Sequence, residues 1–115
     1  LDDYLSPDFV DQTPLPGMPP TRDGVRALFG MMQEGFSDFR VTILEQVGEG
    51  DRVVTHKRFT GKHTGPFLGI PASGNALDFT VIDIIGVRDG RLVDHLVVLD
   101  QMTLLTQLGA LPAKG

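Results

Sequence analysis

The sequence contains no cysteine and no tryptophan, and it has no long uninterrupted hydrophobic run. The absence of cysteine excludes disulfide bonds, thiolate catalysis and cysteine-ligated zinc, and it makes a reducing cytoplasm the expected compartment. No apolar stretch approaches the roughly 18 residues that a membrane-spanning helix needs. We therefore expect no interaction with a membrane through a spanning segment.

Positive charge is also scarce, because 10 Lys and Arg residues stand against 15 Asp and Glu residues. The formal net charge is −5, and no cluster of Lys and Arg exceeds two adjacent residues. Nucleic acid and anionic membrane surfaces are therefore not expected as partners. Hydrophobic residues make up 41% of the 115 residues, which is typical of one globular domain over residues 1–115.

Segments with clear periodicity alternate with segments rich in Gly and Pro. Residues 1–5 are expected to be the last turn of a helix that ends at Ser6-Pro7, and the four prolines of residues 14–20 indicate a stiff connector. The other expected elements are a short strand over residues 8–13, a helix over 21–36, strands over 39–47 and 52–63, a hairpin within 77–101 and a helix over 102–108. This order predicts an α+β fold, in which an antiparallel sheet packs against the apolar stripe of the 21–36 helix.

The hairpin is expected to turn at Asp89-Gly90, a dipeptide that tolerates positive φ. A two-residue turn there places Asp83 opposite Leu96 and Phe79 opposite Asp100. The shared face would then carry Phe79, Val81, Asp83 and Ile85 from one strand, and Asp94, Leu96, Val98 and Asp100 from the other. A one-residue bulge would break this shared face.

Two carboxylates on that face, Asp83 and Asp100, are the main catalytic candidates. An ionised carboxylate among apolar side chains needs a partner, and such groups gather at functional sites. A purely structural role remains an open alternative for each residue. In that case Asp83 forms a buried pair with Lys57 or His63, and Asp100 caps the C-terminal helix.

The strand over residues 52–63 is expected to turn its odd-numbered side chains inward, which places Lys57 and His63 beside the carboxylates. His63 is a candidate general base, with anchoring of the following Gly/Pro loop over residues 64–75 as the alternative. His56 and His95 are expected on the outward face. The residues expected to line the substrate pocket are Lys57, Phe59, Phe67, Phe79, Val81, Leu96 and Val98. No spacing of His and carboxylate residues is typical of a metal site, so no metal is expected.

The other face of the hairpin is apolar as well. It is expected to carry Ile82, Ile84, Val93, Val97 and Leu99. Since both faces of the hairpin need a cover, we expect a homodimer formed through the outer face of the sheet.

Three runs carry a resemblance to a known family: FVDQTPLPGMPPTRDGVRALF, HTGPFLGIPASG and DGRLVDHLVVLDQMTLLTQLGALP. They resemble the SnoaL-like polyketide cyclase and ester cyclase group of the nuclear-transport-factor-2-like superfamily. The resemblance implies a cone-shaped curved sheet wrapped round helices, a pocket at the wide end and often a homodimer. An N-terminal helix usual in the group is expected to be missing or truncated here, and Lys57 stands where an aromatic residue is usual.

The same resemblance implies cofactor-free aldol chemistry in which one aspartate acts as acid and base. The motif DHLVVLDQ assigns that role to Asp100. We therefore expect an enzyme for an enolisable apolar carbonyl compound, with Asp83 as a neutral donor or second carboxylate and with Lys57 and His63 polarising the carbonyl group. The alternatives are a non-catalytic ligand-binding or interaction module on the same fold, and a hydrolase or isomerase that uses the same carboxylates.

Overall fold

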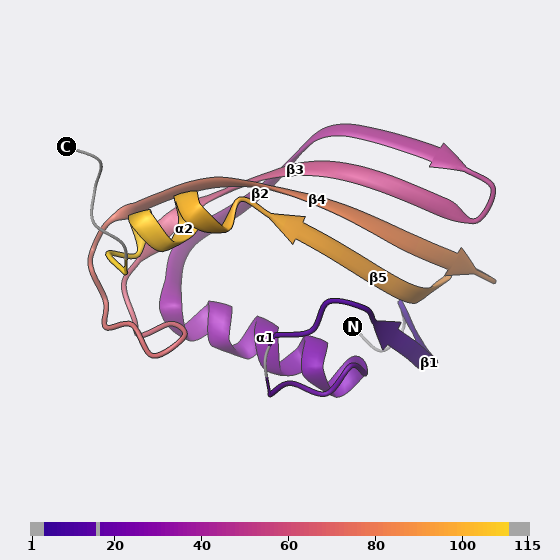
Figure 1. The fold of residues 1–115 in the computed structure, drawn as a ribbon, viewed down its shortest axis with the longest axis horizontal. Helices are drawn as coiled ribbons and strands as arrows, with labels where there is room; N and C mark the ends of the chain where they lie inside the picture. Colours follow the sequence, from indigo (N-terminus) through magenta and orange to yellow (C-terminus); the bar gives the residue numbers. More distant parts are fainter. Residues whose placement is uncertain (1–3, 16, 111–115) are drawn as a thin grey trace.

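The computed structural model describes residues 4–15 and 17–110, which form one curved five-stranded sheet and two helices (Figure 1). The elements in chain order are β1 (Leu5–Asp11), α1 (Arg22–Gly35), β2 (Phe36–Glu49), β3 (Arg52–His63), β4 (Ala76–Arg88), β5 (Arg91–Leu99) and α2 (Gln101–Gln107). The strands lie in the order β1-β5-β4-β3-β2, with β1 parallel to β5 and all other neighbours antiparallel. The expected α+β fold with a curved antiparallel sheet is confirmed.

The turn between β4 and β5 lies at the expected dipeptide. Arg88 pairs with Arg91, so Asp89 and Gly90 are the two loop residues. Both have positive φ, 52° for Asp89 and 76° for Gly90. This backbone matches the right-handed twist of the flanking strands, which explains the choice of Asp-Gly.

The register beyond the turn differs from the expected one because β5 contains a bulge. Val87 pairs with Leu92, whereas Gly86 pairs with Asp94, so Val93 is an extra residue on β5. One extra residue moves every later side chain to the opposite face of the sheet.

The prediction that Leu96 and Val98 share a face with Asp83 is therefore wrong. Asp83 pairs with Val97. Three β5 residues, His95, Val97 and Leu99, share its face, which is the concave face of the sheet. The prediction that Val97 and Leu99 point outward is wrong for the same reason.

The N-terminal strand starts earlier than expected. β1 already begins at Leu5 and runs through Ser6 and Pro7, so the expected helical turn and break are wrong there. The ladder with β5 is irregular between Leu5 and Val10, which is where Pro7 lies. A proline has no N–H for the ladder, and an irregular edge strand can accept it. Residues 1–3 lie outside the described part of the chain.

Helix α1 begins after Thr21, carries Asp23 in its first turn and ends at Gly35, with Phe36 as its C-cap. It crosses below the concave side of the sheet (Figure 1). Only the glycines Gly24 and Gly35 are buried in α1, and the ring of Phe29 remains 46% exposed. The apolar side chains of α1 therefore do not pack fully against the sheet, and open space remains between the helix and the sheet.

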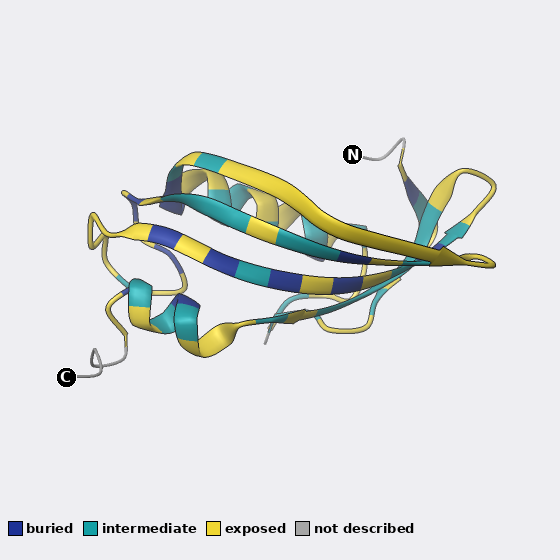
Figure 2. Cartoon of the chain, turned by 90° about the horizontal axis from the view of Figure 1, so that it is seen from above, coloured by how far each residue is buried: buried dark blue, intermediate teal, exposed yellow. Residues whose placement is uncertain are grey.

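Strand β2 is more exposed than expected. All residues from Arg40 to Glu49 are exposed, including Val41 and Ile43 on the concave face, so the prediction of a half-buried strand is wrong. The reason is its position, because β2 is an edge strand with no neighbour beyond it. By contrast, β4 lies inside the sheet and alternates between buried and exposed residues (Figure 2).

The hydrophobic core lies where the loop over residues 64–75 and helix α2 meet β3 and β4. Its buried members are Phe36, Phe67, Leu77, Phe79, Val81, Leu104 and Leu108. Gly109, with φ of +83°, ends α2, and Leu111, expected to make the accompanying contact, lies outside the described residues. Within the described ranges, no helix is long and apolar enough to cross a membrane.

Candidate active site

A buried ion pair lies at the middle of the concave face. Nζ of Lys57 on β3 lies 2.6 Å from Oδ2 of Asp83 on β4. The side chain of Asp83 is only 3% exposed, whereas that of Lys57 is 30% exposed. The pairing expected between these residues is confirmed, and it gives the buried carboxylate a charged partner. The other oxygen of Asp83, Oδ1, is buried without a hydrogen-bond partner in the described part of the chain.

A histidine connects this pair to β1. His95 lies with Nε2 3.9 Å from Oδ2 of Asp83 and with Nδ1 3.8 Å from Oδ1 of Asp11. Asp11 reaches this position because β1 runs parallel to β5 and pairs Asp11 with His95. We call Lys57, Asp83, His95 and Asp11 the charged row.

The charged row includes two residues that sequence reasoning missed. His95 was expected on the outward face, and that prediction is wrong because the bulge at Val93 reverses its direction. Asp11 lies in a short strand whose partner no local pattern reveals. The available signal for Asp11 was the alternation of residues 9, 11 and 13, which places Asp11 on the same face of the strand as the apolar Phe9.

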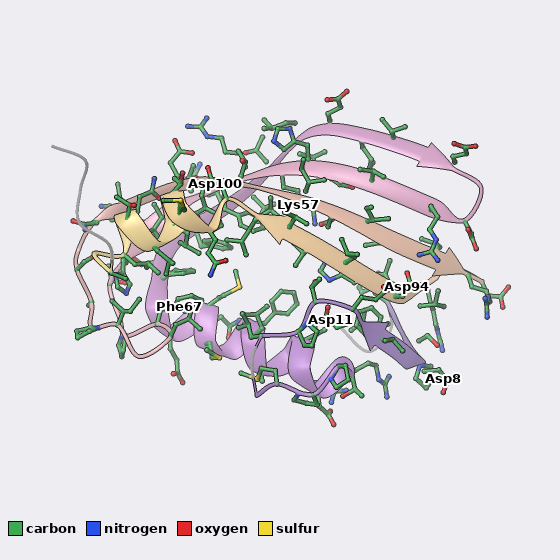
Figure 3. The ribbon with its side chains drawn as sticks, in the orientation of Figure 1. Asp8, Asp11, Lys57, Phe67, Asp94 and Asp100 are labelled. Atoms are coloured by element: carbon green, nitrogen blue, oxygen red, sulfur yellow. The ribbon has the colours of Figure 1, made fainter. Side chains whose placement is uncertain are left out.

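Asp100 lies outside the charged row, at the start of α2 (Figure 3). Its carboxylate accepts a hydrogen bond from the backbone N–H of Thr103 at 3.2 Å and from the Thr103 hydroxyl at 2.6 Å. The helix cap expected as one alternative is therefore confirmed. Asp100 follows Val97, the partner of Asp83, by three residues, which corresponds to roughly 10 Å along a strand. No described contact joins Asp100 to Asp83.

His63 lies at the far end of β3 and is completely buried. Its Nδ1 lies 2.8 Å from Oγ of Ser73 and accepts a hydrogen bond from the Ser73 N–H at 3.2 Å. The backbone of His63 also bonds Gly74 and Asn75. Anchoring of the loop over residues 64–75 by His63 is thus confirmed. On the concave face of β3, His63 lies three side-chain positions beyond Lys57.

An aromatic row leads from an apolar cavity to the charged row. The cavity has a volume of about 420 Å³ and is lined by Phe29, Met32, Gln33, Phe36 and Phe39. Ring centroids lie 5.4 Å apart for Phe39 and Phe59, and 5.3 Å apart for Phe59 and Phe79. Phe59 follows Lys57 by one concave-face position on β3, so an apolar ligand on these rings can reach Lys57 with one end.

The residues expected to line the pocket divide into three groups. Lys57, Phe59, Phe79 and Val81 lie on the concave face, in the rows just described. Phe67 is buried under the loop, with its ring centroid 4.5 Å from that of Phe36. Leu96 and Val98 lie on the opposite face and do not reach the site.

A wider and more polar depression lies at the edge formed by β1 and the tip of the β4–β5 hairpin. Its volume is about 770 Å³, and its lining includes Asp8, Val10, Arg91 and Asp94. Val10 and Asp94 alternate with Asp11 and His95, so this depression opens on the convex side, away from the charged row. Asp94 is already paired with Arg52 at 2.7 Å.

The charge arrangement at the row differs from that of a metal site. Among the described residues, no group of three His, Asp or Glu side chains is placed to hold a metal ion. The row instead combines two carboxylates with one ammonium group and one imidazole. The arrangement can polarise a carbonyl oxygen at Lys57 and hold a proton at His95.

The comparisons with known proteins agree with this fold. The family model for SnoaL-like polyketide cyclases matches residues 1–108. The solved structure of TsrD from Streptomyces laurentii has a TM-score of 0.87 and 35% sequence identity, covering 96% of this chain and 81% of TsrD. IdmH from Streptomyces antibioticus has a TM-score of 0.80 and 33% identity, covering 95% of this chain and 84% of IdmH. The search of curated proteins gives no match.

Proposed function

Because the chain belongs to the SnoaL-like polyketide cyclase family, we propose that it is an enzyme that cyclises or isomerises an apolar carbonyl compound by acid/base chemistry without a cofactor. Its α+β fold is that of the nuclear-transport-factor-2-like superfamily, in which one scaffold serves many functions. The particular reaction is therefore argued from the site.

The observation that carries the proposal is the Lys57–Asp83 pair on the concave face. Enolisation of a ketone places negative charge on the carbonyl oxygen, and a fixed cation beside that oxygen stabilises the transition state. Lys57 is exposed enough to meet a ligand, while Asp83 holds its ammonium group from the buried side at 2.6 Å. A cationic donor held in place in this way does not have to reorganise during the reaction.

The aromatic row supports an apolar substrate. A ligand that lies along Phe39 and Phe59 buries its apolar body against rings whose centroids are 5.4 Å apart. Its carbonyl end then lies beside Lys57, the next residue on the concave face of β3. An aromatic or polycyclic ketone satisfies both contacts, whereas a small hydrophilic carbonyl compound satisfies only one.

Two site assignments from the sequence enter the proposal in different ways. The acid/base role that the resemblance gives to Asp100 stays a prediction. Among the described residues, the hydrogen bonds of this carboxylate are those of the helix cap. His63 is retained as a residue that shapes the end of the pocket through the loop over residues 64–75. The chemistry proposed here depends on the charged row.

A test compares variants of the two carboxylates in one assay. The probe reaction is exchange of the α-protons of 1-tetralone, an apolar enolisable ketone, in D₂O, followed by proton NMR. We expect the exchange catalysed by Asp83→Asn to fall at least 10²-fold, because Lys57 loses the carboxylate that fixes its ammonium group beside the carbonyl oxygen. Asp100→Asn keeps a side-chain oxygen for the cap and is expected to retain exchange, whereas a loss confined to Asp100→Asn would move the acid/base role to Asp100.

A second candidate function is a non-catalytic ligand-binding module. It is favoured by one observation, which is that Lys57 already compensates the charge of the buried Asp83, as a purely structural pair would do. Binding of 1-tetralone to the wild-type protein without any α-proton exchange above the buffer rate would support this candidate and contradict the enzymatic one.

We also propose a homodimer through the convex face of the sheet. Its apolar side chains are contributed by neighbouring strands, and their exposed fractions are 38% for Val54, 48% for Ile82, 36% for Ile84 and 64% for Val98. A contiguous exposed apolar patch of this kind is typical of an interface. Light scattering should give the mass of a dimer for the wild type and of a monomer for Val98→Glu. Val41→Glu on the concave face is the control, and a wild type that is already monomeric contradicts the dimer.

A further inference from the structure

Lys57 and His95 are the more exposed members of the charged row. The exposed fractions are 30% for the side chain of Lys57 and 28% for that of His95, against 3% for Asp83 and 14% for Asp11. Lys57 and His95 also lie beside the same carboxylate oxygen, Oδ2 of Asp83. A ketone whose oxygen contacts Lys57 can therefore place its α-carbon next to the His95 imidazole.

We infer that His95 is the general base that removes the α-proton of the bound carbonyl compound, and that Asp11 and Asp83 are its positioning residues. This inference rests on the proposed function and adds to it the residue that takes the proton. It also gives a reason for the parallel pairing of β1 with β5, because that pairing is what brings Asp11 to His95.

The contacts of the imidazole leave it free to accept a proton. Its nitrogens lie 3.8 Å from Asp11 and 3.9 Å from Asp83, which is longer than a hydrogen bond, and the ring forms no hydrogen bond within residues 4–15 and 17–110. A small rotation brings Nδ1–H to Asp11, and Nε2, which lies 3.9 Å from the Asp83 oxygen that Lys57 also contacts, then keeps its lone pair. A carboxylate that holds an imidazole in this way fixes its tautomer and stabilises the imidazolium ion that forms.

The proposed step is balanced within these groups. The α-carbon–hydrogen bond breaks, its electron pair forms the carbon–carbon double bond of the enolate, and the proton forms the Nε2–H bond of His95. The negative charge moves to the carbonyl oxygen, where Lys57 stabilises it. The imidazolium then returns the proton, either to carbon in an isomerisation or exchange, or to the alkoxide that an aldol addition forms.

The other two histidines do not offer this arrangement. His63 has Nδ1 bound to Ser73 and is fully buried under the loop. His56 pairs with Ile82 on the convex face of the sheet. His95 is thus the histidine whose ring nitrogens face carboxylates on the concave side, and His56 provides a matched control.

The test measures α-proton exchange of 1-tetralone in D₂O at saturating ketone for the wild type, His95→Gln, His95→Ala and His56→Gln. We expect at least a 10²-fold lower exchange rate for both His95 variants and a wild-type rate for His56→Gln. Added imidazole should restore exchange in His95→Ala, because a free base can enter the space that the side chain leaves. A purely structural role of His95 would give no such rescue.

The outcomes separate the inference from the proposed function. If the wild type exchanges and His95→Gln remains within twofold of it, His95 is not the base, although the enzyme proposal stands. If the wild type does not exceed the buffer rate, the enzyme proposal fails, and the inference with it. A loss in His95→Ala that imidazole does not restore also contradicts the inference.

A second variant covers the case in which neither His95 replacement folds. Asp11→Asn keeps an oxygen that can accept the hydrogen bond from the Thr13 N–H, found at 3.0 Å, but removes the charge that faces His95. We expect the maximal exchange rate to fall about tenfold or more while the KM for the ketone stays unchanged, because Asp11 does not contact the ligand. An unchanged maximal rate contradicts the positioning role of Asp11 and the inference.

Discussion

Nε2 of His95 and Oδ2 of Asp83 lie 3.9 Å apart on adjacent antiparallel strands, and the same oxygen of Asp83 lies 2.6 Å from Nζ of Lys57. Asp83 therefore has a cation on one side and an imidazole on the other. Lys57 and Asp83 contribute to both the stability and the proposed chemistry, whereas His95 is assigned to the chemistry, so variants of the pair and of His95 give different results.

The first prediction concerns the Lys57–Asp83 pair. Lys57→Met leaves the buried carboxylate of Asp83 without its cation, and we expect it to lower the free energy of unfolding by about 3–5 kcal/mol. The double variant Lys57→Met/Asp83→Leu removes both charges and should recover most of that loss while remaining inactive. Urea denaturation of the wild type, Lys57→Met, Asp83→Leu and the double variant measures the coupling. Additive losses of stability in the two single variants would show that the pair is not coupled.

The second prediction concerns pH and the convex face. Arg58 donates hydrogen bonds to both oxygens of Asp78, and these lower the pKa of Asp78 below its ordinary value of 3.8. A lowered folded-state pKa stabilises the protein above pH 3.8, and this contribution is lost as the pH falls through the folded-state value. In an NMR titration, Asp78 should titrate below 3.8 in the wild type and at a higher pH in Arg58→Gln. Identical titrations would contradict the role of Arg58.

The third prediction concerns two glycines in α1. A Cβ atom at Gly24 would collide with the carbonyl oxygen of Pro19, whereas one at Gly30 would meet nothing within 4 Å. Gly24→Ala should therefore destabilise the protein by about 1–3 kcal/mol. Gly30→Ala should stabilise it by up to about 1 kcal/mol, because alanine favours the helix. Thermal unfolding of both variants measures the difference, and a stabilising Gly24→Ala would show that α1 can move away from Pro19.

The fourth prediction concerns the loop over residues 64–75. Ser73→Ala removes the hydroxyl that bonds Nδ1 of buried His63 and the N–H of Asn75. We expect faster amide exchange at Gly74 and Asn75, whose backbones bond that of His63, together with a loss of about 1–3 kcal/mol of stability. Ser37→Ala on β2 is the control, because its hydroxyl forms no hydrogen bond to the described residues. Unchanged exchange in Ser73→Ala would mean that other contacts hold the loop.

Several features of this chain follow from the sequence by itself, because they depend on residues close together in the chain. The alternation along β3, the turn at Asp89-Gly90, the helix over residues 22–35 and the cap at Asp100 are all of this kind. Propensity, hydrophobic period and side-chain capping act over a few residues, so their signals can be read locally. The resemblance in three sequence runs likewise indicated the family.

The tertiary structure alone decided which residues meet at the site. The bulge at Val93 turns His95 inward, and no local pattern marks it, because a bulge depends on how the whole hairpin twists and packs. The parallel pairing of β1 with β5 brings Asp11 to His95 across more than 80 positions of sequence, and a strand partner that remote leaves no periodic signal. The exposure of β2 is also a tertiary property, because it results from the position of β2 at the edge of the sheet and not from its alternating sequence.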